Sequence, residues 1–466
     1  SGPYLNRFID WVLDVQPSFI YNECTLWSRK HEYAGTADAI AEINHKVYLL
    51  DFKGLALDTP LPTPEGWTTM GAVQVGDRLF DRNGKTCRVT EKSSVHLKRC
   101  YRVFFDDGSE IVCDHDHRWL TVTGQSSCMR QGVWTTEEIA GRLFGSNKQR
   151  DQRVPVAGAL NLPERDLPVH PYVLGCWLGD GKTASGEFFG ADDFIFSEIS
   201  RCGYAIGSNS EKREGFCQAR TIYGLRTQLR ENDLLGHKHI PSAYLRASTA
   251  QRLALLQGLM DTDGCWNRAR NSAVFSVTNK TLAHDLHELA LSLGQRANFH
   301  EFTARGFGKE SAAWRVTFTP NGINPFRLPR KADQVTDGTA RSSRRIITSA
   351  QPTVSVRTQC VMVDSPDHTY LCGETMIPTH NTGKGIYAEV GLQLSALAGC
   401  DFVITPDGQE HEIPPVECLA ALHIRPRSCR LFPVNNQEEN FTCFLAAREI
   451  LRWQEDISPH VLGEPR

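Results

Sequence analysis

The 466-residue sequence lacks the features that would direct it to a membrane or out of the cell. It contains no run of about eighteen apolar residues, so no membrane-spanning helix is expected. Its start, Ser1-Gly2-Pro3, shows no basic-then-apolar signal pattern, and the missing Met indicates a processed or truncated start. The 15 cysteines form no paired Cys-x-x-Cys ladders of the zinc-ribbon type. We therefore expect a cytoplasmic protein with reduced thiols.

The sequence also lacks an excess of positive charge, since its net charge is −3. Global charge therefore does not indicate nucleic-acid binding, which would have to depend on local basic segments such as residues 327–331 and 341–345. Hydrophobic residues make up 40% and charged residues 23% of the chain, as is normal for globular protein. A chain of this length exceeds one ordinary core and predicts two to four domains.

Turn signals and apolar runs change along the chain. Residues 47–53 (Val-Tyr-Leu-Leu-Asp-Phe-Lys) are short, apolar and typical of a strand. From Leu61 onward, closely spaced turn signals such as Asp-Arg-Asn-Gly at residues 81–84 predict a compact all-β unit with hairpins. Strand-like sequence returns at residues 354–363, and a helical pattern covers residues 388–397.

The segments on either side of residues 54–381 match one continuous domain when they are joined. Removing residues 54–381 takes away 328 residues and leaves 138, a normal size for one domain. It also connects the strand ending at Lys53 directly to Thr382-Gly383-Lys384-Gly385. A domain inserted in a loop is the alternative, but such insertions usually avoid the middle of a functional strand and turn.

The end of the block carries residues that can break a peptide bond. Asn381 precedes the hydroxyl residue Thr382, and its side-chain amide can attack its own carbonyl to form a succinimide. The neighbouring His380 can protonate or orient the reacting groups. The Thr382 hydroxyl can accept an acyl group as an ester. The His-Asn pair is a weak signal alone and gains weight from the joined flanks.

Blocks at both ends of the insert resemble those of inteins, a family of self-excising proteins. Residues 54–63 (Gly-Leu-Ala-Leu-Asp-Thr-Pro-Leu-Pro-Thr) and 75–77 (Val-Gly-Asp) resemble the opening block, and residues 376–381 (Met-Ile-Pro-Thr-His-Asn) resemble the closing block. The resemblance implies intramolecular splicing that needs no cofactor. It also implies a β-rich, horseshoe-shaped Hint fold, split into residues 54–165 and 336–381.

The first residue of the insert departs from the family pattern. Most inteins begin with Cys or Ser, which attacks the preceding carbonyl, whereas Gly54 has no side chain. One interpretation is an engineered Cys-to-Gly exchange that traps the precursor. The favoured interpretation is a class-three intein, which uses an internal cysteine and carries a Trp, a Cys and a Thr. Trp119, Cys360 and Thr379 match those three positions.

The class-three resemblance implies how splicing begins. Cys360 would attack the Lys53 carbonyl and displace the Gly54 nitrogen, giving a thioester. His117 would strain or protonate that amide, with Asp114 assisting. A buried hydrophobic role is the alternative for a free cysteine such as Cys360. A metal cluster over residues 113–117 is disfavoured, because alternate side chains of a strand diverge.

The resemblance also implies how splicing ends. The acyl group would move to the Thr382 hydroxyl, and Asn381 would cyclise with help from His380 and release the insert. An O-to-N shift would then make the peptide bond between the flanks. Trp119 and Thr379 would position groups rather than react.

Two stretches inside the insert resemble the paired helices of LAGLIDADG homing endonucleases. They are residues 174–181 (Leu-Gly-Cys-Trp-Leu-Gly-Asp-Gly) and 256–264 (Leu-Gln-Gly-Leu-Met-Asp-Thr-Asp-Gly), the second ending an apolar helix that is closed by glycine. The resemblance implies that Asp180 and Asp263 hold Mg²⁺ or Mn²⁺ at a shared site, where metal-activated water hydrolyses DNA. Lys238 matches a third family block and would offset transition-state charge.

This resemblance implies an α/β endonuclease domain over residues 166–335. Its curved antiparallel sheets would lie in the major groove of double-stranded DNA, where base pairs are distinguishable. A turn is the alternative for any single Asp-Gly pair. Two copies with the lysine block between them weigh against it. We expect a monomer from a bacterial cell or a phage.

The joined flanks resemble PD-(D/E)XK nucleases of the RecB exonuclease type. Residues 35–39 (Gly-Thr-Ala-Asp-Ala) and 51–53 (Asp-Phe-Lys) carry this resemblance. It implies that three acids bind Mg²⁺ or Mn²⁺ while a lysine orients water or offsets phosphate charge. An ordinary strand with a surface Asp and Lys is the alternative. The expected host-site residues are Asp38, Asp51, Glu23, Lys53 and Gln393.

The expected architecture is a multidomain α+β protein. Its host domain would be a split α/β, restriction-endonuclease-like fold made of residues 1–53 and 382–466. Because Lys53 ends the first half, we expect the precursor to be inactive as a host nuclease. Two competing interpretations are a DNA nuclease that never splices and a Hedgehog-like protein that transfers its N-terminal part to another acceptor.

Overall fold

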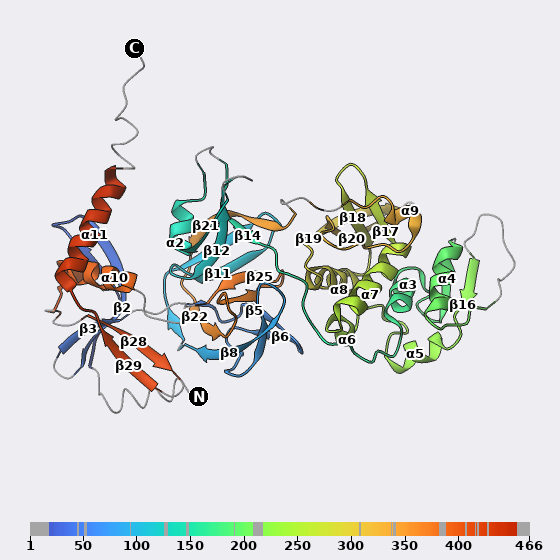
Figure 1. The fold of residues 1–466 in the computed structure, drawn as a ribbon, viewed down its shortest axis with the longest axis horizontal. Coiled ribbons are helices and arrows are strands. Elements are labelled where there is room, and N and C mark those ends of the chain that lie inside the picture. Colours follow the sequence, from blue (N-terminus) through green and yellow to red (C-terminus); the bar gives the residue numbers. More distant parts are fainter. Residues whose placement is uncertain are drawn as a thin grey trace, which may run out of the picture.

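The chain folds into three units that lie in a row in the computed structural model (Figure 1). The flank unit contains the first and the last described elements, β1 and α11, the β-rich unit lies in the middle, and the helical unit lies at the far end. The structure describes residues 18–43, 46–50, 54–93, 95–124, 129–145, 149–190, 192–207, 218–306, 309–336, 338, 342–381, 388–405, 408–414, 416, 419–425 and 428–453.

The flank unit contains an antiparallel sheet built from segments before and after the insert. Its strand order is β27-β26-β1-β2-β3, so strands from the end of the chain pair with the first strand. Its elements are β1 (Ser18–Ser28), β2 (Tyr33–Ile43), β3 (Lys46–Leu50), α10 (Ala388–Ala398), β26 (Phe402–Ile404), β27 (Glu410–Glu412), β28 (Ala420–Arg425), β29 (Ser428–Pro433) and α11 (Gln437–Arg452).

One hydrophobic core joins the two flanks. Leu26 and Ile40 from the first flank pack with Leu394 and Leu397 from the second. A Cβ added at Gly35 would meet the end of the Leu397 side chain, which would have to move, so glycine suits the close contact between α10 and β2. The two flanks therefore form one unit although the insert separates them, as the joined sequence predicted.

The β-rich unit contains an eleven-stranded sheet and smaller hairpins, together with one short helix. The expected turn at residues 81–84 joins β7 and β8, and Gly84 has a positive φ of 76° there. The elements are β4 (Leu55–Ala56), β5 (Pro60–Thr63), β6 (Gly66–Thr69), β7 (Arg78–Phe80), β8 (Thr86–Lys92), β9 (His96–Leu97), β10 (Cys100–Phe105), β11 (Glu110–Asp114), β12 (Arg118–Thr123), β13 (Arg130–Thr135), α2 (Thr136–Gly141), β14 (Arg153–Pro155), β21 (Arg344–Thr353), β22 (Arg357–Gln359), β23 (Val361–Val363), β24 (Thr369–Cys372) and β25 (Ile377–His380).

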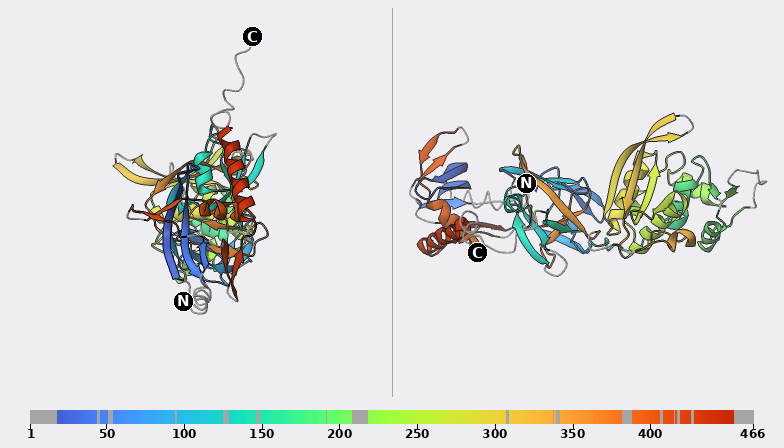
Figure 2. Two further views of the ribbon diagram at one scale, coloured as in Figure 1. Left: turned by 90° about the vertical axis from the view of Figure 1, so that its left-hand side faces the viewer. Right: turned by 90° about the horizontal axis from the view of Figure 1, so that it is seen from above.

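The helical unit is built around α3 and α7, and its β19–β20 hairpin extends away from the helices (Figure 2). Leu160 and Leu162 already belong to its core, ahead of the boundary expected at residue 166. The elements are α3 (Pro171–Asp180), β15 (Glu187–Gly190), α4 (Asp193–Arg201), β16 (Gln218–Thr221), α5 (Leu225–Glu231), α6 (Ser242–Leu245), α7 (Thr249–Thr262), β17 (Gly264–Asn267), β18 (Ser272–Val277), α8 (Lys280–Ser292), β19 (Ala297–Gly306), β20 (Lys309–Phe318) and α9 (Pro329–Ala332).

Two glycines let α3 and α7 pack backbone to backbone. A Cβ on Gly175 would lie 2.3 Å from the Leu255 carbonyl oxygen, and one on Gly258 would lie 2.2 Å from the Tyr172 carbonyl oxygen. The expected helix pair is therefore present. Gly264 does follow the end of the second helix, as expected, but its φ is not positive. A Cβ on Gly264 would instead collide with Met260, which explains the glycine by close packing.

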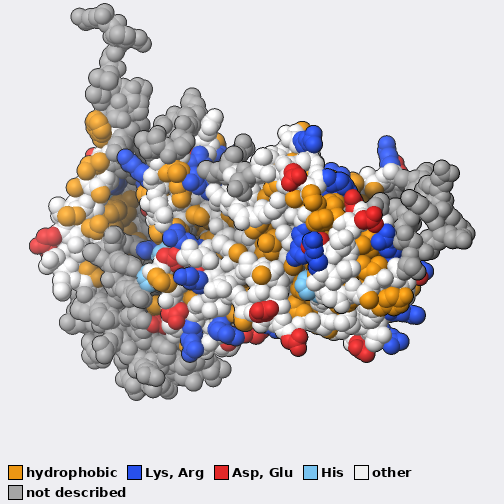
Figure 3. Space-filling model, turned by 45° about the vertical axis from the view of Figure 1, so that its right-hand side comes forward, with side chains coloured by type: hydrophobic (Ala, Val, Ile, Leu, Met, Phe, Trp, Pro, Cys, Tyr) orange, Lys and Arg blue, Asp and Glu red, His pale blue; other side chains and the backbone are white. Residues whose placement is uncertain are grey.

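The surface shows positive and negative side chains side by side. Lys and Arg alternate with Asp and Glu over the face drawn in Figure 3, in keeping with the small net charge. Among the described helices, none is long and apolar enough to cross a membrane.

Candidate functional site

The start of the insert lies between two strands that carry expected splicing residues. Strand β4 pairs with β11 on one side and with β22 on the other. The backbone N–H of Asp114 donates to the Gly54 carbonyl oxygen at 3.0 Å. Cys360 directly follows β22. The fold therefore brings Asp114 and the segment leading to Cys360 to opposite sides of residue 54.

Position 54 has no room for a side chain. A Cβ built on Gly54 would lie 2.5 to 2.7 Å from the backbone C, O and N atoms of Gln359. Real Cβ atoms essentially never approach backbone so closely, and a backbone segment within a paired strand cannot rotate away. Any larger residue at this position therefore requires β4 or β22 to shift.

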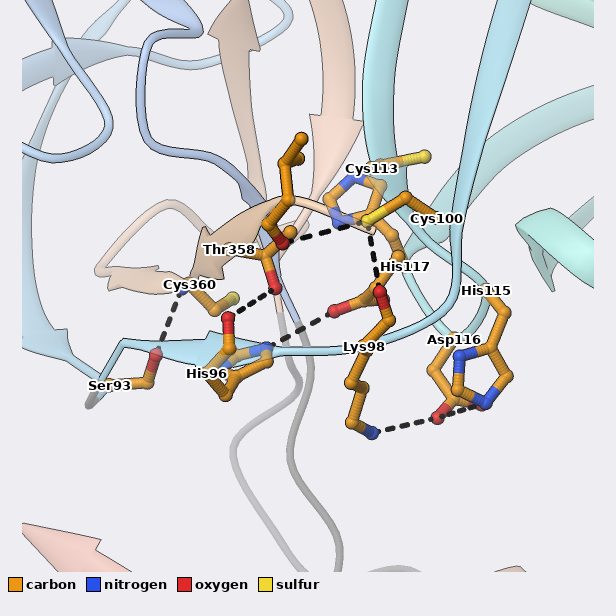
Figure 4. Close-up of polar contacts among 12 residues, drawn as sticks. Ser93, His96, Lys98, Cys100, Cys113, His115, Asp116, His117, Thr358 and Cys360 are labelled. Carbon is orange, nitrogen blue, oxygen red and sulfur yellow. Dashed lines mark hydrogen bonds and ion pairs between the residues drawn. The ribbon is translucent and has the colours of Figure 1, made fainter. Parts of the chain in front are cut away.

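Cys360 is held by its backbone next to this junction. Its N–H donates to Ser93 Oγ at 3.0 Å, and its carbonyl accepts from the Ser93 N–H at 2.8 Å. Only 5% of the residue is exposed, and its Sγ lies 3.5 Å from the Val361 carbonyl oxygen. Figure 4 shows Cys360 beside Ser93, with His96 and Thr358 close by. The thiol is thus buried at the junction.

His117, Trp119 and Thr379 form one buried cluster. His117 Nε2 and Thr379 Oγ1 lie 2.5 Å apart, and the Trp119 ring meets the His117 ring edge-on at 5.1 Å. The Trp119 Nε1–H donates to Thr136 Oγ1 at 3.0 Å, which fixes the indole. Burial lowers the pKa of His117 to about 4, so its imidazole is neutral near pH 7.

Asp114 has an imidazole partner that the sequence did not reveal. His96 Nε2 lies 3.3 Å from Asp114 Oδ2, while the other carboxylate oxygen, Oδ1, is buried without a hydrogen-bond partner. His96 lies in the two-residue strand β9, and only its pairing with β22 brings it here. The described residues contain no group of three or more His, Cys, Asp or Glu that could hold a metal ion.

The end of the insert is also buried and tightly bonded. Asn381 is fully buried, and its N–H donates to the His368 carbonyl at 2.7 Å. Its side-chain amide fits its surroundings when the NH₂ group donates to His368 O and the oxygen accepts from Val363 N–H, each at 3.0 Å. His380 Nδ1 donates to the Asn381 carbonyl at 2.6 Å. Lys53 and Thr382 lie outside the described residues.

The helical unit holds a second cluster of expected site residues. The Asp180 and Asp263 side chains are hydrogen bonded to each other at the adjacent ends of α3 and α7, and burial and Asp263 raise the pKa of Asp180 to about 6. Lys238 Nζ donates to the Gly179 carbonyl at 2.8 Å. A cavity of about 570 Å³ lies beside them, and Lys238 and Asp263 line it.

A second lysine that sequence reasoning missed completes this cluster. Lys331 Nζ donates to the Met260, Asp261, Thr262 and Gly264 carbonyl oxygens at the end of α7. Lys331 therefore donates to carbonyl oxygens at the end of α7, as Lys238 does at the end of α3. The pseudo-symmetry of the helix pair could have revealed it, because a repeated element implies a repeated partner.

The expected host site is described only in part. The β1–β2 register places the backbone of Glu23 opposite that of Asp38, and Gln393 lies on α10. Asp51 and Lys53 fall outside the described residues, as do the side chains of Glu23 and Asp38. The host site therefore stays a prediction.

Comparison with known proteins finds similarity over parts of the chain. Residues 250–318 match the family model of the LAGLIDADG-like domain. The chain is 41% identical over 358 residues to the replicative DNA helicase DnaB of Mycobacterium intracellulare, covering 72% of this chain and 59% of that one. It is 46% identical over 100 residues to DnaB of Mycobacterium leprae, covering 20% and 17%. The chain therefore spans less than two thirds of each relative.

Solved structures of an intein and of a homing endonuclease are also similar to this chain. The MchDnaB-1 intein is 20% identical, with a TM-score of 0.25, over 70% of this chain and 99% of that chain. Mesophilic variants of the homing endonuclease I-DmoI are 14% identical, with a TM-score of 0.23, over 32% and 88%.

These comparisons support the predicted LAGLIDADG domain, through the family match over residues 250–318. They do not support the predicted nuclease host, because both curated relatives are replicative DNA helicases.

Proposed function

We propose that residues 54–381 splice themselves out as a class-three intein, with Cys360 as the first nucleophile. The observation that carries this proposal is the backbone contact between Gly54 and Gln359. An intein that begins with Cys or Ser needs a side chain at residue 54, and that side chain would collide with the Gln359 backbone. The same contact puts the segment that leads to Cys360 against the bond to be broken.

The first step uses groups that lie around Gly54. The Cys360 sulfur adds to the Lys53 carbonyl carbon, the bond to the Gly54 nitrogen breaks, and the thiol proton ends on that nitrogen. The Asp114 N–H holds the Gly54 carbonyl and so fixes the leaving group in place. His117 is neutral and therefore able to accept and return a proton near pH 7.

The last step uses the buried contacts of Asn381. The His380 Nδ1–H draws electron density from the Asn381 carbonyl, which makes its carbon a better target for the side-chain amide nitrogen. Asn381 is fully buried, which excludes water from its reacting groups. Cyclisation breaks the bond between Asn381 and Thr382, and an O-to-N shift leaves an ordinary peptide bond.

Intact mass after expression in reducing buffer tests the splicing proposal. We expect products of 138 and 328 residues from the full chain and an uncleaved 466-residue chain from the Cys360→Ala variant. Cys87→Ala is the matched control, because Cys87 is a buried thiol of the same unit on another strand. An unspliced wild-type chain that splices only after Gly54→Cys would overturn the proposal.

We further propose that the helical unit cleaves double-stranded DNA with Mg²⁺ or Mn²⁺ held by Asp180 and Asp263. Two buried carboxylates that repel each other fit a divalent cation, because the cation would relieve both burial and repulsion. Such a cation supplies activated water and charge neutralisation when bound. Lys238 and Lys331 add positive charge beside the carboxylates.

The DNA that encodes the joined flanks is the substrate to test. We expect cleavage near the codons for Lys53 and Thr382, and no cleavage of the interrupted gene. The double variant Asp180→Asn, Asp263→Asn is expected to be inactive. Equal cleavage of both genes would refute this assignment.

The host stays open between two activities. A helicase follows from the names of the relatives, but the 72% of this chain that the longer alignment covers is no larger than the insert and a few neighbouring residues. Metal-dependent degradation of linear DNA by the spliced 138-residue product would support the nuclease, and ATP hydrolysis without degradation would support the helicase.

A further inference from the structure

We propose that helix α8 positions Lys238 in the DNA-cleavage site, through Asn279 at the start of the helix and Asp285 in its second turn. This inference rests on the proposed endonuclease function. It makes Asn279 and Asp285 positioning residues, which act on the reaction through Lys238 and not as reacting groups.

Lys238 lies in a segment that has no regular structure of its own. Residues 237–241, between α5 and α6, belong to neither a helix nor a strand. The Lys238 side chain nevertheless has a defined place, because its Nζ donates to the Gly179 carbonyl at 2.8 Å and lies 5.4 Å from the centre of the Trp177 ring. Other elements must therefore hold the backbone from which this side chain extends.

Asn279 bonds to α8 and to Lys238 at the same time. Its Nδ2–H donates to the Lys238 carbonyl at 2.7 Å, and its Oδ1 accepts from the Leu282 N–H at 3.2 Å. The second bond caps the first turn of α8, so the Asn279 side chain cannot rotate without loss of the cap. Asn279 thus ties the Lys238 backbone to the start of the helix.

Asp285 holds the same segment two residues further on. Its Oδ2 accepts from the Ile240 N–H at 2.8 Å, and Ile240 itself is buried in the core of the helical unit. A single bond to Lys238 would leave the segment free to pivot. The second bond, at Ile240, fixes the direction of the segment as well as its position.

The helix that provides both anchors is packed against the helix that carries Asp263. Leu282 and Leu286 of α8 and Leu255 and Leu259 of α7 belong to one buried core, and Asp263 directly follows α7. This core therefore sets the distance between Lys238 and Asp263. A displacement of about 1 Å at a reacting group can slow catalysis by about 10²-fold, so loss of an anchor should slow cleavage.

Single-turnover cleavage of the DNA that encodes the joined flanks, with Mg²⁺ and the full chain, tests the role of Asn279. Asn279→Ser keeps an oxygen that can cap α8 but is too short to bond to the Lys238 carbonyl as well. We expect cleavage to slow by about 10 to 10²-fold. DNA affinity without Mg²⁺ should stay within about twofold, and the unfolding temperature within about 2 °C.

Asn232→Ser is the matched control for this exchange. The Asn232 Nδ2–H donates to the Gln228 carbonyl at 2.8 Å, within the end of α5, and makes no bond to the Lys238 segment. This variant should cleave DNA at the wild-type rate.

Two exchanges test the second anchor in the same assay. Asp285→Ala removes the acceptor for the Ile240 N–H and should slow cleavage by about 10 to 10²-fold. Asp285→Asn keeps an acceptor oxygen of the same reach, so it should restore the rate to within about threefold of wild type.

A Lys238→Ala background separates positioning from a general structural effect. If Asn279 acts through Lys238, Asn279→Ser should slow the remaining cleavage by no more than about twofold in this background. A further loss of about tenfold there would overturn the inference, and so would a wild-type rate for Asn279→Ser alone. If the wild-type chain with Mg²⁺ cleaves no DNA, the proposed endonuclease function fails, and this inference fails with it.

Discussion

Single atoms at residue 54 decide which splicing chemistry is open to this chain. The missing Cβ of Gly54 leaves the Gln359 backbone in contact with the junction. Gly54→Ala is therefore expected to destabilise the β-rich unit by about 1 to 3 kcal/mol through overpacking and to slow splicing. Thermal unfolding and the fraction of spliced product at fixed time measure the two effects.

Gly141→Ala is the matched control for this exchange. A Cβ at Gly141 would meet nothing within 4 Å, and the residue ends helix α2. This variant should be neutral or up to about 1 kcal/mol more stable, because alanine favours the helix. Equal behaviour of the two alanine variants would show that position 54 tolerates a side chain.

The buried His117 makes stability depend on pH. Its folded-state pKa of about 4 lies below the ordinary value of 6.5, so the fold binds its proton less readily than the unfolded chain. Its contribution is therefore present above pH 6.5 and is lost as the pH falls towards 4. The lowered pKa of His117 corresponds to at most about 3 kcal/mol of the free energy of unfolding.

Unfolding by urea between pH 4 and pH 7.5 measures this dependence. His117→Asn should flatten the curve for the β-rich unit. His287→Asn removes the other histidine whose pKa burial lowers to about 4, and it should flatten the curve for the helical unit instead. A His117→Asn curve with the wild-type slope would contradict the assignment.

At the scale of elements, the contact between α3 and α7 brings two like charges together. Burial and Asp263 raise the pKa of Asp180 to about 6. The contribution of protonated Asp180 to the free energy of unfolding is therefore present at low pH and is lost as the pH rises through 6. Asp263→Asn should therefore raise the unfolding temperature at pH 7.5 without metal, while DNA cleavage is abolished.

Added Mg²⁺ gives a second readout of the same element. It should stabilise the wild-type helical unit and have little effect on the Asp180→Asn, Asp263→Asn variant, since binding to the folded state alone raises stability. Asp193→Asn, at a mostly exposed carboxylate, is the control that should keep the Mg²⁺ effect. Equal Mg²⁺ stabilisation of the double variant would exclude these carboxylates as ligands.

At the scale of the whole molecule, Arg246 connects the helical unit to the β-rich unit. It forms an ion pair with Glu288 at 2.6 Å and donates to the Thr63 and Gly66 carbonyl oxygens. Arg246→Ala removes the guanidinium from these partly exposed acceptors and should cost about 1 to 3 kcal/mol. We expect calorimetry to show the two units unfolding separately, with DNA cleavage retained.

Arg305→Ala tests whether the loss of any ion pair makes the two units unfold separately. Arg305 pairs with Glu310 on an exposed hairpin, where an ion pair contributes little. A single unfolding transition in Arg246→Ala, like that of Arg305→Ala, would show that other contacts suffice to join the units.

The sequence by itself predicted the order of the parts and the ends of the insert. Asn381, the joined flanks and the repeated Asp180 and Asp263 segments are local patterns, and local patterns can be read along a chain. The β-rich texture after Leu61 and the close helix pair were predictable for the same reason.

Only the tertiary structure decided which side chains meet. The His96–Asp114 contact depends on pairing between β9, β22, β4 and β11, strands that are far apart in the sequence. The absence of room at Gly54 also depends on a backbone contact across hundreds of residues. Long-range strand pairing is set by the packing of the whole core, so the sequence pattern around each residue carries no record of it.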